Sequence, residues 1–306
     1  MRIKVLYGIC LILCQTIVLN CSDTGGNEST VAGYRASVQE WHHTRIESLK
    51  KPDGWLSLAG LFWLKEGENT FGSHPSNDIV FPDEAAPDNI GAFIMQDGKV
   101  RITLKPDVNV LHQGQTVDAM ALQSDADGEP TILEWNTFSW YVIKRSDTEY
   151  AVRLKNSEHP GLQSFHGVDT YPIDQAWRVE AQLLPYDEPK EITYNTVYGS
   201  VQQAPSPGLL TFKIDGREYS LTPIAEPGDE QYFVMFADQT NGKETYGSGR
   251  FLSVDAPDAN GRTVIDFNKA YNPPCAFTPF ATCPLPPAEN KLSISVLAGE
   301  KDSGMH

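Results

Sequence analysis

The chain has 306 residues, with 24 Lys and Arg against 40 Asp and Glu, which gives a formal net charge of −16 at pH 7. Its hydrophobic fraction of 40% can fill one large core or two smaller ones, which excludes a disordered chain, and five Cys in this length exclude a small disulfide-stapled scaffold. The acidic balance argues against nucleic acid and against an anionic membrane surface as partners, because both bind through basic side chains.

The N-terminus has the pattern of a secretory signal. Arg2 and Lys4 precede an apolar run over residues 5–19, which is too short for a comfortable membrane span. The run ends in VLN directly before Cys21, which resembles a bacterial lipobox, where the cysteine is lipidated and becomes the new N-terminus. We expect a lipoprotein signal peptide over residues 1–20, a membrane anchor at Cys21, and a periplasmic or surface-exposed place in the bacterial cell envelope. An ordinary cleaved signal, with Cys21 incidental, is the alternative.

A tether and one helix are expected next. Residues 21–30 carry no large apolar side chain and predict a flexible tether. Over residues 31–50, apolar side chains recur at three- and four-residue spacing, which predicts an amphipathic helix that ends at the PDG sequence of residues 52–54. The stripe consists of Val31, Tyr34, Val38, Trp41, Arg45 or Ile46, and Leu49.

The remainder of the chain alternates apolar and polar residues between frequent turn signals, which is typical of β-sandwiches and barrels. Asp-Gly pairs at residues 97–98 and 215–216 predict two-residue hairpin turns. Strands are expected over residues 91–95, 99–104, 138–144, 150–155, 211–214, 217–221, 232–237, 251–254, 263–267 and 292–297. The sequence therefore predicts a mainly β chain.

The length suggests two β-sandwich-like units, over residues 51–157 and 158–302. The seam is expected in residues 156–170, which are rich in Gly, Ser, His and Pro. The APSPG sequence at residues 204–208 is a second loop region and could be a simple hairpin connection.

A polar loop cluster in the second unit is the candidate site, since functional groups concentrate on loops held by a rigid scaffold. Its members are Asp238, Thr240, Glu244, Tyr246, Arg250 and, further along the chain, Lys301. In a binding site, Arg250 and Lys301 would clamp an anion while Thr240 and Tyr246 donate hydrogen bonds; in an active site, Glu244 or Asp238 would act as base with Tyr246 as a further catalytic candidate. The alternative is structural: Asp238 and Thr240 bond the backbone of a turn, and Arg250 pairs with Asp238 or Glu244.

Cys275 and Cys283 lie in a proline-rich loop, and in an oxidising compartment they predict a disulfide. A metal site or a catalytic thiol is the weaker alternative. Zinc-binding cysteine pairs are usually two to four residues apart, and a cysteine nucleophile would need a nearby His base, for which only His159 or His166 is a candidate. The common nucleotide, serine-hydrolase and zinc-protease motifs are absent, so no cofactor or metal is expected.

Several long motifs together resemble the bacterial domain-of-unknown-function family 1684. They are DGWLSLAGLFWL at residues 53–64, DQTNGKETY at 238–246, GRFL at 249–252, DFNKAYNPPCAF at 266–277 and AGEK at 298–301. The resemblance covers roughly residues 41–301 and implies no activity.

A second, weaker resemblance is to the forkhead-associated domain, and it implies a β-sandwich. The residues that carry it are 71–79, 89–91 and 97–98. Ser73 stands where that family has its phosphate-binding Arg, so phosphopeptide binding is not implied.

Two functions remain open. The first is a lipid-anchored binding or structural module of the cell envelope, whose cationic site in the second unit takes a small anionic or carbohydrate ligand. The second is an extracytoplasmic hydrolase that uses Glu244 or Asp238 with Tyr246 and Arg250. If these side chains converge on a pocket with unpaired carboxylate oxygens, the site is functional; if they are used up by each other and by the backbone, it is structural.

Overall fold

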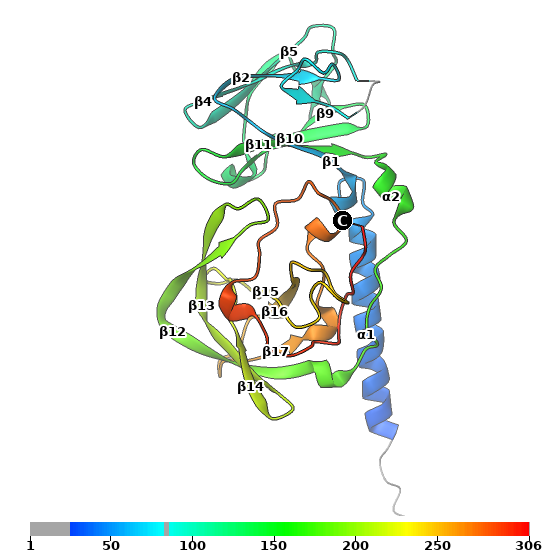
Figure 1. Ribbon diagram of the computed structural model, residues 1–306, viewed down its shortest axis with the longest axis vertical. Helices are drawn as coiled ribbons and strands as arrows, with labels where there is room; N and C mark the ends of the chain where they lie inside the picture. Colours follow the sequence, from blue (N-terminus) through cyan, green and yellow to red (C-terminus); the bar gives the residue numbers. More distant parts are fainter. Residues whose placement is uncertain (1–24, 83–85, 306) are drawn as a thin grey trace, which may run out of the picture.

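The computed structural model describes residues 25–82 and 86–305 (Figure 1). The expected signal peptide and Cys21 lie outside the described residues. One long helix leads into several β-sheets, so the predicted fold class, mainly β with one N-terminal helix, is confirmed. Figure 1 shows two groups of strands, here called the first β unit (β1–β11) and the second β unit (β12–β17), with helix α1 running beside the second.

Helix α1 spans Gly25–Leu49 and therefore begins inside the segment expected to be a tether. A helical backbone satisfies its own hydrogen bonds, so exposed polar turns can continue a helix that packing stabilises further along. The predicted stripe is the side that faces the protein: Val38 and Leu49 are buried, and its other positions are half-buried.

Polar contacts also hold α1 on the second β unit. The Tyr34 hydroxyl donates to Asp266 Oδ1 over 2.9 Å, and Arg45 Nε lies 2.8 Å from Glu300 Oε1. Burial and the Asp266 carboxylate raise the pKa of Tyr34 well above its usual range, which keeps its hydroxyl protonated as a donor. The helix is thus attached through specific hydrogen bonds as well as apolar packing.

The first β unit consists of two sheets with strand orders β1-β11-β10-β9-β6-β7 and β3-β2-β4-β5-β8. Its strands are β1 Leu58–Trp63, β2 Gly67–Gly72, β3 Ile79–Val80, β4 Gly91–Gln96, β5 Lys99–Leu104, β6 Leu111–His112, β7 Gln115–Thr116, β8 Ala119–Leu122, β9 Leu133–Trp135, β10 Phe138–Lys144 and β11 Tyr150–Asn156. The hairpin predicted at Asp97 and Gly98 joins β4 to β5, and both residues have positive φ, 50° and 69°, as the favoured two-residue hairpin turn requires.

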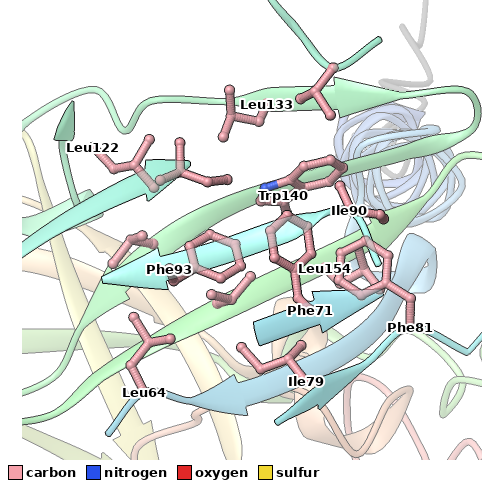
Figure 2. Packing of buried hydrophobic residues seen from close by; sticks show 14 of the residues in the cluster. Leu64, Phe71, Ile79, Phe81, Ile90, Phe93, Leu122, Leu133, Trp140 and Leu154 are labelled. Atoms are coloured by element: carbon pink, nitrogen blue, oxygen red, sulfur yellow. The ribbon is translucent and has the colours of Figure 1, made fainter. Parts of the chain in front are cut away.

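An aromatic core lies between the two sheets (Figure 2). The Phe71 ring centroid is 4.6 Å from that of Phe93 and 5.9 Å from that of Trp140. In β11, Val152 and Leu154 belong to this core. Because successive side chains of a strand point to opposite faces, the residue between them, Arg153, lies on the outer face of its sheet.

The second β unit has a sheet of order β14-β13-β12-β17 and a separate pair β15-β16. Its strands are β12 Arg178–Asn195, β13 Val201–Ile214, β14 Arg217–Leu221, β15 Gln231–Phe236, β16 Arg250–Asp255 and β17 Arg262–Asp266. Apolar side chains from all six strands form one cluster around Phe236 and Phe267. The hairpin predicted at Asp215 and Gly216 joins β13 to β14.

Two expectations for this unit are wrong. Residues 204–208 are not a loop: they lie inside β13, where Pro205 pairs with Glu191 and Gly208 with Pro185. Proline is tolerated there because this end of β13 has β12 as its neighbour but not β14, which pairs only with residues 210–214. The partner strand also bulges between Pro185 and Lys190.

Residues 292–297 are likewise not a strand, although Leu292 and Val296 are buried as the alternation predicts. Their backbone is held by individual bonds instead of a ladder. Leu292 N–H donates to the Ala237 carbonyl over 2.8 Å, and the Val296 carbonyl accepts from Arg250 Nη2 over 3.0 Å. Alternation therefore predicted the side-chain pattern correctly but not the backbone partners.

The two units meet around a third cluster of buried side chains. Its members include Leu49 of α1, Leu56 and Leu58 at the start of the first unit, and Tyr246 and Phe277 of the second. Strand β11 ends at residue 156 and the short helix α2, Pro160–Ser164, follows, so the expected boundary at 157–158 falls between them; the division into domains stays a prediction. Within the described residues, no helix is both long and apolar enough to span a membrane.

Candidate functional site

Arg250 and Asp238 of the predicted cluster form a fully buried ion pair. Arg250 Nη2 lies 2.7 Å from Asp238 Oδ2, and neither side chain is exposed to solvent. The Arg250 guanidinium also donates to the carbonyls of Val296 (3.0 Å), Ala298 (2.5 Å) and Glu300 (3.3 Å). Burial lowers the pKa of Arg250, while the Asp238 carboxylate beside it works in the opposite direction. The pair ties β16 to the C-terminal segment.

The other oxygen of Asp238 closes a turn. Asp238 Oδ1 accepts from the backbone N–H of Thr240 over 2.8 Å and from its hydroxyl over 2.6 Å. Asn241 completes the turn, since its Oδ1 accepts from Asp238 N–H over 2.5 Å. Both carboxylate oxygens of Asp238 are thus used, and this corresponds to the structural alternative for Asp238, Thr240 and Arg250.

Glu244 and Lys301 meet at a different side chain, Tyr171. The Tyr171 hydroxyl donates to Glu244 Oε2 over 3.0 Å, and Lys301 Nζ lies 4.7 Å from the centre of the Tyr171 ring. Burial, together with the Glu244 carboxylate, raises the pKa of Tyr171 to about 12. Tyr246 is buried in the third cluster. The six predicted residues are thus divided between the buried ion pair with its turn, the contacts of Tyr171 and the third cluster, and their roles in binding or catalysis stay predictions.

The structure links Cys275 to Cys283 by a disulfide. The loop it closes leans on the hairpin of β12 and β13: Val197 N–H donates to the Cys283 carbonyl over 3.0 Å, and Leu285 N–H donates to the Asn195 carbonyl over 2.7 Å. The disulfide loop, residues 275–283, is thereby held beside the tip of that hairpin.

A pocket of about 320 Å³ lies between the two β units, at this hairpin tip, and is here called the interunit pocket. Figure 1 shows the β1-β11-β10 sheet of the first unit on the side of the second unit. The first unit contributes one side chain from the short 3-10 helix before β1, one from the residue after β10 and one from β11. These are Trp55, Arg145 and Arg153. The second unit contributes Tyr194, Thr196, Gln202, Phe251 and Thr282, with Pro274, Cys283 and Pro284 of the disulfide region.

Arg153 is the most unusual residue of the pocket. Its exposed fraction is 4%, and its Nε is buried without a hydrogen-bond partner. Its Nη atoms lie 3.4 Å from the Tyr141 hydroxyl and 3.3 Å from Thr282 Oγ1, both long contacts with neutral groups. The guanidinium carbon is 5.4 Å from the centre of the Trp55 ring. Among the described residues, no carboxylate pairs with Arg153.

Arg145 lies beside it and is already paired. Its Nη1 lies 2.9 Å from Asp125 Oδ2, and its Nε donates to Thr282 Oγ1 over 3.0 Å. Gln202 Nε2 in turn donates to the Arg145 carbonyl over 2.7 Å. Thr282, next to the disulfide, therefore accepts hydrogen bonds from both arginines and joins the units at the pocket.

The rest of the wall is mostly apolar. Phe251, Pro274 and Pro284 present carbon, and the phenol of Tyr194 is sufficiently buried that its pKa is raised. None of the described residues that line the pocket is an Asp or a Glu. A cationic group in an acid-free, partly apolar cavity is suited to binding an anion. Among the described residues, no group of three or more His, Cys, Asp or Glu could hold a metal ion.

Comparisons with known proteins match part of the chain. A family model described as "Protein of unknown function (DUF1684)" matches residues 163–301. This segment of the chain belongs to that family. Among solved structures, an uncharacterized protein of Haloarcula marismortui, determined by solution NMR, is 30% identical over 47% of this chain and 80% of its own, with a TM-score of 0.40. No curated protein matches the chain.

The DUF1684 match covers only one side of the interunit pocket. Tyr194, Gln202 and Thr282 fall inside residues 163–301, whereas Arg145 and Arg153 fall before them. The matched segment by itself thus contains the apolar and hydroxyl wall but neither arginine.

Arg153 was not predicted as a site residue, although the sequence contains one signal of its burial. Residues 150–154 read YAVRL, a nearly continuous apolar run of the kind found in strands covered on both faces. An Arg inside such a run is expected to be buried whichever face it takes. Its missing acidic partner, in contrast, cannot be predicted without the fold.

Proposed function

We propose that this protein is a binding module of the cell envelope that holds a small anion in the interunit pocket through Arg153, with Arg145 beside it. The observation that carries the proposal is the burial of Arg153 with no carboxylate partner in the described part of the chain. The candidate site thereby moves from the loop cluster of the second unit to the junction of the units.

Charge burial is the physical reason. Removing a charged group from water costs several kcal/mol unless a partner of opposite charge repays the cost. At Arg250 that partner is Asp238, at 2.7 Å. At Arg153, the contacts found among the described residues are two hydroxyls and the Trp55 ring. A bound anion would therefore supply the missing negative charge, whereas a neutral carbohydrate would supply none.

The hydrolase alternative has less support. Both oxygens of Asp238 are bonded to Arg250 and Thr240, so Asp238 lacks the free geometry expected of a general base. Glu244 is exposed, and one of its oxygens accepts from the Tyr171 hydroxyl. The loop cluster is better explained as a brace that fixes the C-terminal segment.

We also propose that the module is attached to the membrane by lipid at Cys21. The support is the sequence pattern: a basic start, an apolar run over residues 5–19 and a lipobox-like VLN before the cysteine. Such an anchor would keep the binding domain in the periplasm or at the cell surface.

A thermal-shift screen of small anions against the purified full chain tests the binding proposal. A ligand that binds only the folded state raises the melting temperature, and at a concentration of 100 Kd it adds about 2.7 kcal/mol. We expect at least one organic anion to stabilise the wild type and the control Arg101→Met, whose side chain is exposed on β5, but not Arg153→Met. Equal stabilisation of all three proteins would contradict the proposal.

A further inference from the structure

We infer that the ligand of the interunit pocket is a small monocarboxylate with a flat apolar body, the chemistry of an aromatic carboxylic acid. The inference rests on the proposed anion-binding function and adds the ligand class. Three properties of the pocket carry it: its uncompensated charge, its size, and the side chains that line it.

The pocket carries one uncompensated positive charge. Of its two arginines, Arg145 is neutralised by Asp125 at 2.9 Å, whereas Arg153 forms no ion pair with any residue that the structure describes. A carboxylate with charge −1 matches that charge. A phosphate monoester carries about −1.5 to −2 at pH 7 and would leave negative charge unmatched in a protein whose net charge is already −16.

The size limits the ligand to a small molecule. The volume of about 320 Å³ is at the lower end for ligand sites. One water occupies roughly 30 Å³ in the liquid, so the pocket holds on the order of ten non-hydrogen atoms. A single substituted ring with its carboxylate has this size, whereas a nucleotide or a disaccharide exceeds it.

The lining combines polar groups at the arginines with apolar side chains. Thr282 Oγ1 accepts from Arg145 Nε and Arg153 Nη2, which uses both lone pairs of a hydroxyl oxygen. Its own hydrogen is then available to donate to an anion held by Arg153. Phe251, Pro274 and Pro284 in the lining offer apolar contact, which suits the face of a ring.

Calorimetric titration of the full chain with four probes tests this class: benzoate, its neutral isostere benzamide, acetate, and phenyl phosphate. We expect benzoate to bind at least about tenfold more tightly than benzamide, because a hydrogen bond to a charged group contributes about one to two factors of ten. Benzoate should also bind more tightly than acetate, which lacks the ring, and than phenyl phosphate, which carries excess charge.

Variants of the pocket locate the site where benzoate binds, and they distinguish a failure of the ligand class from a failure of the anion site. Arg153→Met and Thr282→Val should each weaken the binding of benzoate at least about tenfold, while Arg101→Met binds as the wild type does. If Arg153→Met does not fold, Thr282→Val still reports on the hydroxyl that contacts Arg153. Tighter binding of phenyl phosphate or acetate through Arg153 would overturn the ligand class and leave the anion site standing. Binding of benzamide equal to benzoate would overturn the ligand class. Binding insensitive to both variants, or the absence of binding by all three anions, would overturn the anion site as well.

Discussion

The two buried arginines of this protein should respond in opposite ways to the same substitution. Arg250→Met removes a guanidinium that pairs with Asp238 at 2.7 Å and donates to the carbonyls of Val296, Ala298 and Glu300. Arg153→Met removes one that has only long contacts with hydroxyls, at 3.3 and 3.4 Å. Methionine retains much of the arginine stem's volume in both cases, so the comparison isolates the charge.

The expected magnitude follows from what each variant leaves behind. In Arg250→Met, Asp238 becomes a buried carboxylate without its cation, and breaking a buried pair in this way costs about 3–5 kcal/mol. That is a large part of the 5–15 kcal/mol typical of folded proteins, and at about 2–4 °C per kcal/mol it lowers the melting temperature by roughly 6–20 °C. In Arg153→Met a desolvated charge disappears and no carboxylate loses its partner. The free energy of unfolding should therefore fall by no more than about 1 kcal/mol, or rise.

Urea unfolding of the ligand-free full chain, followed by tryptophan fluorescence, measures both changes. The double variant Arg250→Met/Asp238→Asn should lose less than the sum of its single variants, because the orphaned charge is then absent. We assign a structural role to Arg250 and a binding role to Arg153. A decrease in the free energy of unfolding below about 1 kcal/mol for Arg250→Met, or of several kcal/mol for Arg153→Met, would refute this assignment.

Three further predictions concern the rest of the chain. Mass spectrometry of unreduced peptides should find Cys275 linked to Cys283, and the double Cys→Ser variant should lose about 2.5 kcal/mol for a loop of about nine residues; two alkylatable thiols would contradict this. A fatty-acid probe should label the protein in bacterial cells and fail to label Cys21→Ala, whereas equal labelling of both would rule out the anchor. Because the pKa of Tyr171 is raised to about 12, its neutral form stabilises the fold below pH ~10, and this contribution is lost as the pH rises toward 12. Ultraviolet titration of Tyr171→Phe should therefore lack one tyrosinate step in that range. A difference spectrum unchanged from the wild type would contradict the contact with Glu244.

Local signals predicted much of the fold. Asp97-Gly98 and Asp215-Gly216 supply the positive φ values that a two-residue hairpin needs, so the hairpins β4-β5 and β13-β14 could be read from the sequence. The apolar stripe of α1 is the side that packs against the protein. In these places a few neighbouring residues determine the structure.

Where the partner is distant, prediction failed. Pro205 made residues 204–208 resemble a loop, because nothing local shows that this end of β13 pairs with one strand only. Residues 292–297 alternate like a strand, but their backbone bonds go to Arg250 and to single residues of another segment. The pairing of Arg250 with Asp238 was foreseen as one alternative, since the two lie twelve positions apart in one loop region. The pocket could not be foreseen, because its arginines and Thr282 are separated by more than a hundred residues.

The most direct test of the central claim observes the arginine side-chain N–H signals by nitrogen–proton NMR while the full chain is titrated with its tightest-binding anion. The spectrum of Arg153→Met identifies the signal of Arg153. We predict that this signal shifts to saturation with the ligand, while that of Arg250, whose guanidinium is already bonded to Asp238 and three carbonyls, stays in place. An Arg153 signal that remains unchanged while the anion is bound would contradict the account.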